Sequence, residues 1–189
     1  MDQNAQLQRL LDKDAIRDLV QIYCRAADRH DHELMRSLYH EDAYDDHGSF
    51  FKGAAMEFID MLPEIQKPMA ILHHNVTTHN ILFDDSRPDY AEGETYIIAF
   101  HKVKPEPEAA GFDVLIGGRY FDKYEKRDGV WKFLSRSIDA DWVYVSDPSA
   151  VMLDHPMIDG VHIGVPGTAD PSYELLKLFA PGPFKPSGD

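Results

Sequence analysis

The stretch MAILHHNVTTHNILF (residues 69–83) decides the fold of this chain. Its polar and apolar side chains alternate with a period near two, which predicts one long β-strand. The stretch AEGETYIIAFHKV (91–103) predicts a second strand, and DDSRPDY (84–90) predicts the turn between them. Residues 112–126 and 130–143 predict a hairpin about an RDG turn. Strands of this length must bend, and we expect the glycine pair GG at 117–118 to permit it.

Helical patterns precede these strands. Residues 7–29 and 31–40 each carry apolar side chains at helical spacing, with a short strand and turn, DAYDDHGSF, at 42–50. Residues 53–66 predict a third helix, kinked or broken at Pro63. Helices followed by an antiparallel meander predict an α+β fold. We expect a cone-shaped, curved antiparallel sheet wrapped around the N-terminal helices, with a pocket between them.

Composition limits the classes of function. The chain has 189 residues and 43% hydrophobic content, which suits one domain, and we expect a domain of residues 1–146 and a packed C-terminal arm of 147–189. The net charge of −14 argues against binding to nucleic acid or anionic membranes. One cysteine excludes an intrachain disulfide, and the polar N-terminus does not resemble a signal peptide. We therefore expect a cytoplasmic protein.

The strand at 69–83 carries polar side chains on both of its predicted faces. Strict alternation places His74, Val76, Thr78, Asn80 and Leu82 on one face, and His73, Asn75, Thr77, His79 and Ile81 on the other. A simple two-layer sheet would show one mainly apolar face. We therefore expect one face to line a wet cavity and the other to meet solvent or a second subunit.

Two charged residues lie where the pattern predicts burial. Asp28 ends a line of the first helix that includes Val20 and Cys24, so it sits at the edge of the apolar face. It is either a helix-end residue that reaches water or part of a site. Arg136 lies between aliphatic residues in the last strand, so it needs an anionic partner or ligand unless it extends to solvent at a subunit seam.

Four motifs in this order resemble a known group. They are Y-x4-D-R-x-D at 23–31, EDA at 41–43, H-x3-T-H-N-I at 74–81 and IGGRYFDKYEKRDGVWKF at 116–133. From about residue 10 to residue 143 the chain resembles the SnoaL-like branch of the nuclear-transport-factor-2-like superfamily. Within it, the chain is most similar to scytalone dehydratases, bile-acid 7α-dehydratases and hexachlorocyclohexane dehydrochlorinases.

The resemblance implies a set of site residues. The His–Asp dyad of those enzymes falls on His74 and Asp28, with His73 as the base if the strand register slips by one. The helix tyrosine of the dehydratases falls on Tyr23, and the arginine of the last strand falls on Arg136. His73, Tyr96, His101 and Asn80 are the expected substrate-binding residues, of which His101 and Tyr96 are candidates for the further His or Asp that the dehydratases carry on the neighbouring strand.

Asp28 would orient and polarise His74, which would then take a carbon-bound proton. Tyr23 or Arg136 would stabilise charge on the departing oxygen. We therefore expect a lyase, without cofactor or metal, for a hydroxylated aromatic or polycyclic molecule, of the dehydratase type or releasing formaldehyde. The alternatives are a non-catalytic binding module, with the dyad apart and the cone filled, an isomerase or cyclase, and a metal enzyme using HDH (30–32) or HHNVTTH (73–79).

The C-terminal arm predicts assembly. Its apolar side chains, and the second face of the strand at 69–83, both need a cover that a neighbouring subunit could provide. The relatives named above are trimers and much of the wider superfamily is dimeric. We therefore expect a homo-oligomer, with a trimer favoured over a dimer.

Overall fold

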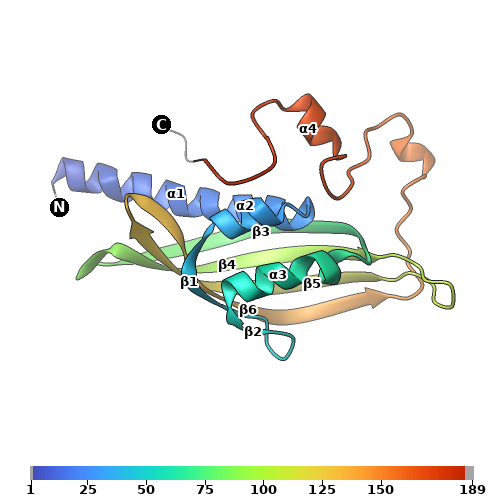
Figure 1. Cartoon of the computed structure of the whole chain (residues 1–189), viewed down its shortest axis with the longest axis horizontal. Coiled ribbons are helices and arrows are strands. Elements are labelled where there is room, and N and C mark those ends of the chain that lie inside the picture. The colour runs from blue at the N-terminus through green and yellow to red at the C-terminus, as the bar shows by residue number, and fades with distance from the viewer. Residues whose placement is uncertain (1, 186–189) are drawn as a thin grey trace.

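A computed structural model describes residues 2–185 of the chain. Six strands form one curved, unclosed sheet in the order β2-β1-β6-β5-β4-β3 (Figure 1). They are β1 (Tyr39–Asp46), β2 (Lys52–Ala54), β3 (Met69–Asp84), β4 (Arg87–Val103), β5 (Asp113–Arg127) and β6 (Val130–Ser146). Only the β1–β6 pair is parallel among the strands described. The predicted α+β fold is confirmed.

The helices lie together over one face of the sheet (Figure 1). They are α1 (Gln3–Asp28), α2 (His32–Ser37) and α3 (Ala55–Gln66). Asp2 begins α1 by accepting a hydrogen bond from the backbone N–H of Ala5, and the apolar line from Ile16 to Ala27 packs into the core. None of the helices between residues 2 and 185 is long and apolar enough to cross a membrane.

Three element boundaries differ from the sequence expectation. The second helix ends at Ser37, because Tyr39 already pairs with Phe133 in β6. The third helix is not broken at Pro63, which lies in its last turn. The predicted turn at 84–90 is shorter, since β4 begins at Arg87. The Asp84 carboxylate accepts hydrogen bonds from the backbone N–H of Ser86 and from Arg87 Nε, which closes this turn tightly.

A β-bulge in β3 corrects the predicted faces of this strand. Val76 pairs with Ile97 and His79 pairs with Thr95, so two residues, Thr77 and Thr78, lie opposite Tyr96 alone. The extra residue reverses the alternation. His74, Val76, His79 and Ile81 therefore all face the helices, whereas Leu82 is 77% exposed on the outer face. The expectation that His79 and Ile81 share a face with His73 was wrong.

A second bulge changes the neighbours of Arg136. Tyr124 pairs with Phe133 and Lys123 pairs with Ser135, so Leu134 is the extra residue in β6. Arg136 therefore shares the inner face with Phe133, and not with Leu134 as strict alternation predicted. The other register shift in the β5–β6 pair falls at Gly117–Gly118, the expected bending point.

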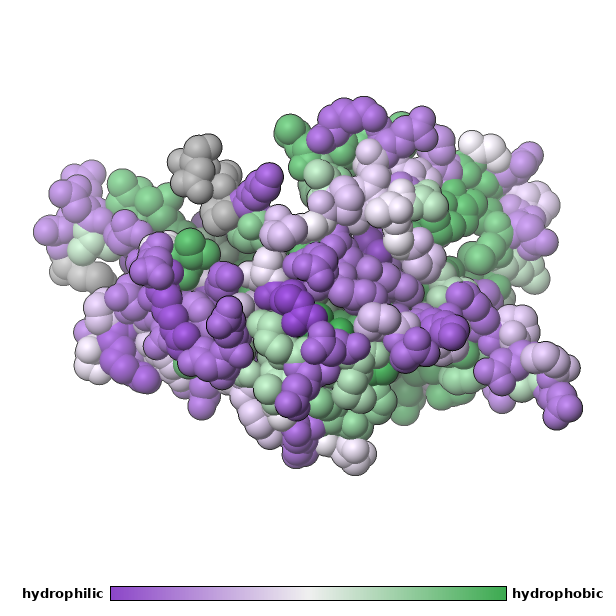
Figure 2. Space-filling model, in the orientation of Figure 1, coloured by the Kyte–Doolittle hydropathy of each residue, from purple (hydrophilic) through white to green (hydrophobic). Residues whose placement is uncertain are grey.

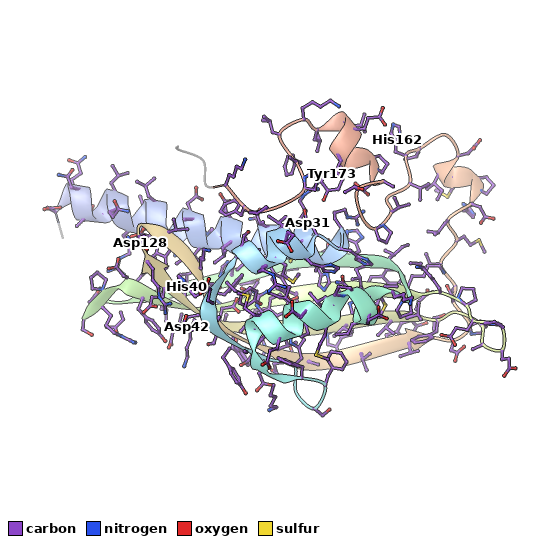
Figure 3. All side chains as sticks on the ribbon, in the orientation of Figure 1. Asp31, His40, Asp42, Asp128, His162 and Tyr173 are labelled. Carbon is purple, nitrogen blue, oxygen red and sulfur yellow. The ribbon has the colours of Figure 1, made fainter. Side chains whose placement is uncertain are left out.

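The C-terminal arm, described here to residue 185, crosses the outer side of α1 and α2 (Figure 1). It contains η1 (Pro156–Ile158) and α4 (Pro171–Leu175). Asp170 forms an ion pair with Arg29 at 2.5 Å, and Tyr173 of α4 lies above Asp31 in Figure 3. The division at residues 146 and 147 stays a prediction, and residues 186–189 of the arm lie outside the described residues.

Candidate active site

The last turn of α1 and the first half of β3 bring Asp28 and His74 together. Asp28 Oδ1 lies 2.6 Å from His74 Nδ1, and both side chains are almost buried, with exposed fractions of 12% and 11%. The two carboxylate oxygens also lie 3.2 and 3.1 Å from the backbone nitrogen of His74 and accept a hydrogen bond from it. The carboxylate is therefore fixed by both the ring and the main chain of one residue.

This geometry leaves one nitrogen of His74 free. When Nδ1 donates to the carboxylate, Nε2 carries the lone pair of a neutral imidazole. His74 Nε2 has no hydrogen-bond partner between residues 2 and 185. Because an oriented imidazole with a free nitrogen can accept a proton, the pair can act as a general base.

Two further histidines lie beside the pair. The His101 ring in β4 is centred 5.7 Å from the His74 ring, and His30 follows α1 with a left-handed backbone (φ 52°). Burial lowers the pKa of His101 to about 4, with a smaller contribution from His74. Burial and the neighbouring His32 lower the pKa of His30 to about 4 as well. Both rings are therefore neutral near pH 7, and the Nε2 atom of each is buried and has no hydrogen-bond partner among residues 2–185.

Tyr23 and Arg136 lie in the packed interior of the cone. Arg136 is fully buried and forms two hydrogen bonds to Asp122, Nε to Oδ1 and Nη2 to Oδ2, each 2.8 Å long. Its guanidinium lies 4.0 Å from the ring centres of both Tyr23 and Tyr120. Burial raises the pKa of the Tyr23 phenol, and Arg136 only partly opposes this rise. The alternative that Arg136 extends to solvent at a subunit seam is therefore wrong.

Sequence reasoning missed Asp122 as the partner of Arg136. A signal was present in β5, where Tyr120, Asp122 and Tyr124 are spaced two apart and all face inward. A carboxylate between two inward-facing aromatic residues needs a cation, as Arg136 needs an anion. The two requirements satisfy each other across the β5–β6 pair, where Asp122 and Arg136 are direct neighbours.

The structure does not bring the other expected substrate-binding residues to this site. His73 and Asn80 are exposed on the face of β3 opposite to His74, and Tyr96 is 40% exposed on the outer face of β4, near Arg119. Only His101 of this group lies beside the dyad. The alternative in which His73 replaces His74 does not fit, because Asp28 contacts the His74 ring.

A cavity of about 620 Å³ opens beside the dyad. It lies between α1, which contributes Arg17, Gln21 and Cys24, and β3, which contributes His74 through Thr77 and His79. Burial raises the pKa of the Cys24 thiol to about 12, so this residue is a neutral side chain and not a nucleophile.

The histidines do not form a metal centre. Between residues 2 and 185, no three His, Cys, Asp or Glu side chains are grouped so that they could hold a metal ion. Two residues of the motif at 30–32 already have other hydrogen-bond partners. Asp31 caps α2 by accepting a hydrogen bond from the backbone N–H of Leu34, and His32 is hydrogen-bonded to Gln66. The residues present do not fit the metal-enzyme alternative.

Comparison with known proteins agrees with this fold. The family model for the SnoaL-like domain matches residues 8–137. The chain belongs to the SnoaL-like family. A search of the curated proteins found no match to the sequence.

Several solved structures share the SnoaL-like fold. LinA is 25% identical with a TM-score of 0.67, and the match covers 80% of this chain and 99% of LinA. The hexachlorocyclohexane dehydrochlorinase LinA-type3 from Novosphingobium barchaimii is 21% identical, with a TM-score of 0.68 and coverage of 80% and 99%. A protein assigned as a scytalone dehydratase from Novosphingobium aromaticivorans is 22% identical, with a TM-score of 0.64 and coverage of 76% and 91%. The fold is thus one that dehydratase-like and dehydrochlorinase proteins use.

Proposed function

We propose that this SnoaL-like protein is a cofactor-independent lyase in which His74 is the base and Asp28 holds it. The observation that carries the proposal is the 2.6 Å contact between His74 Nδ1 and Asp28 Oδ1 beside an open cavity. A binding module without catalysis would not need this contact, which fixes the tautomer and orientation of an imidazole. The substrate is a hydroxylated aromatic or polycyclic molecule.

The elimination needs only the protein's own groups. His74 Nε2 takes a proton from the carbon next to the carbon–oxygen bond, and the C–H electron pair forms the double bond. The carbon–oxygen bond breaks, and the departing oxygen takes the proton from His74 Nε2, so that water leaves and the neutral base is restored. Neutral His101 beside His74 can donate a hydrogen bond to that oxygen. In the formaldehyde-releasing variant, His74 takes the proton of one hydroxyl group and the adjacent carbon–carbon bond breaks. The electron pair of that bond expels a second hydroxyl group from the neighbouring carbon.

Tyr23 and Arg136 have a supporting place in this scheme. Arg136 is neutralised by Asp122 and has no exposed surface, so it does not meet the substrate directly. Cys24, one turn before Asp28 on α1, is near both groups, because both Arg136 and Asp28 influence its pKa. We therefore assign Tyr23 and Arg136 to the positioning of α1, whose last turn carries Asp28.

The test compares two adjacent histidines of β3. We expect His74→Ala to abolish turnover of hydroxylated diarylpropanes, measured as loss of water by mass spectrometry or as trapped formaldehyde. His73→Ala is the matched control, since His73 lies on the opposite, exposed face of the same strand. Both variants should keep the thermal midpoint of the wild type. Activity that survives in His74→Ala contradicts the proposal, and a wild type that binds without turnover is a binding module.

We also propose that the protein is a homo-oligomer, with a trimer favoured over a dimer. Apolar side chains remain exposed on the arm, among them Met157 at 86% and Leu178 at 97%. Figure 2 shows such hydrophobic side chains gathered where the arm passes the ends of the strands. Surface of this kind favours association. Light scattering at micromolar concentration would give the mass, and a monomer of 21.6 kDa would contradict the proposal.

A further inference from the structure

The cavity beside the dyad is a groove between a helix and the free edge of the sheet. β3 is the last strand of the sheet, and α1 packs along it (Figure 1). The backbone N–H of His74 points away from β4, because Asp28 accepts its hydrogen bond. The main-chain groups of Val76, two residues after His74, lie on the same edge of the strand. These groups therefore face the groove.

The groove is long enough for a molecule of two rings. Its α1 wall runs from Asp28 back to Arg17, eleven residues, which is about 16 Å at the rise of an α-helix. Its β3 wall runs from His74 to His79, five residues, which is also about 16 Å at the rise of a strand. The two walls thus place the dyad at one end and Arg17 near His79 at the other.

The end of the groove distant from the dyad is positively charged. Arg17 lines the cavity, and it has no hydrogen bond or ion pair to any residue between 2 and 185. Its neighbour Asp18 forms no ion pair with it in the part of the chain that the structure describes. Lys13, one turn earlier on α1, adds a second positive charge, which contributes to the lowered pKa of His79. Arg17 is a solvent-exposed residue that lines the cavity, so its guanidinium is accessible to a ligand.

The middle of the groove carries both polar and apolar side chains, with Asn75 and Thr77 among the residues that line it. Cys24 contributes a neutral thiol, which packs as a small apolar side chain, and Val76 contributes an aliphatic one. Gln21 lies between Arg17 and Cys24 on the same line of α1 and supplies an amide to this wall. Along the α1 wall the order of side chains is therefore the Arg17 cation, the Gln21 amide, the Cys24 thiol and then Asp28 of the dyad.

We infer that the groove binds an elongated aryl substrate that carries a carboxylate, with the carboxylate on Arg17 and the reacting carbon at His74. The placement of the reacting end rests on the proposed function, whereas the placement of the carboxylate does not. A guanidinium binds a carboxylate through two parallel hydrogen bonds, which fixes both position and direction. The contact would therefore select the substrate and set which carbon reaches His74 Nε2.

The test uses two probes of the same shape and different charge, 4′-hydroxybiphenyl-4-carboxylate and its neutral carboxamide. Binding is measured by isothermal titration calorimetry. We expect the wild type to bind the carboxylate about ten to a hundred times more tightly, the range for a hydrogen bond to a charged group. Arg17→Gln should remove this preference. Arg9→Gln is the matched control, because Arg9 lies on the same helix but pairs with Asp85.

The outcomes separate this inference from the proposed function. His74→Ala should keep the preference for the carboxylate, because the base does not contact that group. A preference that persists in His74→Ala and disappears in Arg17→Gln supports the inference even if no turnover is found. Equal affinities in the wild type, a preference retained by Arg17→Gln, or no binding of the carboxylate at millimolar concentration would each overturn it.

Discussion

Two of the buried pairs of a carboxylate and a nitrogen-bearing side chain, Asp28–His74 and Asp122–Arg136, differ in what surrounds them. Asp28 and His74 join a helix end to the edge strand, and each side chain keeps about a tenth of its surface exposed. Asp122 and Arg136 join the two central strands β5 and β6, and neither has any exposed surface. The first pair leaves His74 Nε2 without a partner between residues 2 and 185, whereas Asp122 binds Arg136 at two points.

The difference separates a reactive pair from a structural one. A base must reach its substrate, so a pair at a cavity can exchange protons and a sealed one cannot. A sealed ion pair instead has its largest effect when one partner is lost, because the other remains as an uncompensated charge. We therefore expect substitutions in the first pair to change turnover, and substitutions in the second to change the free energy of unfolding.

The largest effect is expected from Asp28→Asn. The amide keeps the shape of the carboxylate but can donate a hydrogen bond to His74 Nδ1, which would move the ring proton to Nε2 and block the base. A comparable change in another carboxylate–histidine pair lowers kcat by roughly 10⁴-fold, and we expect a similar loss.

Two measurements check the Asp28→Asn prediction. The ¹⁵N shifts of the His74 ring should report the change of tautomer, and the thermal midpoint should move little. An unchanged rate would return Asp28 to the role of a helix-end residue and would remove the contrast between the two pairs.

The next largest effect is expected from Asp122→Asn. It leaves the Arg136 charge buried and uncompensated, which costs about 3–5 kcal/mol in the free energy of unfolding. Urea denaturation would measure this loss.

Arg136→Lys keeps the charge but loses the planar fork, so we expect a smaller loss in the free energy of unfolding. The double variant Asp122→Leu with Arg136→Met removes both charges and should be more stable than Asp122→Asn. A stable but inactive Asp122→Asn would instead place Arg136 in the chemistry.

The sequence was sufficient to predict elements, and less so to predict which way the side chains face. The long strand, the hairpin and the α+β order follow from periodicity, and Asp28 stood out because a carboxylate ended an apolar line of the helix. The bulge at Thr77–Thr78 could not be predicted, because an extra residue leaves no mark on composition. His74 lies before this bulge, so its face was assigned correctly, whereas His79 and Ile81 lie after it.

Pairing across the sheet was the other missing information. Arg136 was recognised as needing an anion, but its partner depends on the register of β5 against β6, which contains a bulge at Leu134. The cavity was expected inside the cone, yet the structure has aromatic rings around Arg136 there and an open groove at the β3 edge. Packing of this kind depends on the volumes of side chains that meet only in the folded chain.

The smallest effect is expected in the dependence of stability on pH near the open pair. The pKa of His101 is about 4 in the folded protein and near 6.5 in the unfolded chain. Between these values the His101 side chain binds more protons in the unfolded chain, so its contribution to stability is constant above about pH 6.5 and falls as the pH is lowered toward 4. His101→Gln removes one group that resists protonation. We therefore expect its thermal midpoint to fall less than that of the wild type between pH 7 and pH 4.5.

His162→Gln, at an exposed histidine of the arm (Figure 3), is the control and should follow the wild type. Identical pH profiles for His101→Gln and the wild type would mean that folding does not lower the pKa of His101, and the ring would then be charged below about pH 6.5.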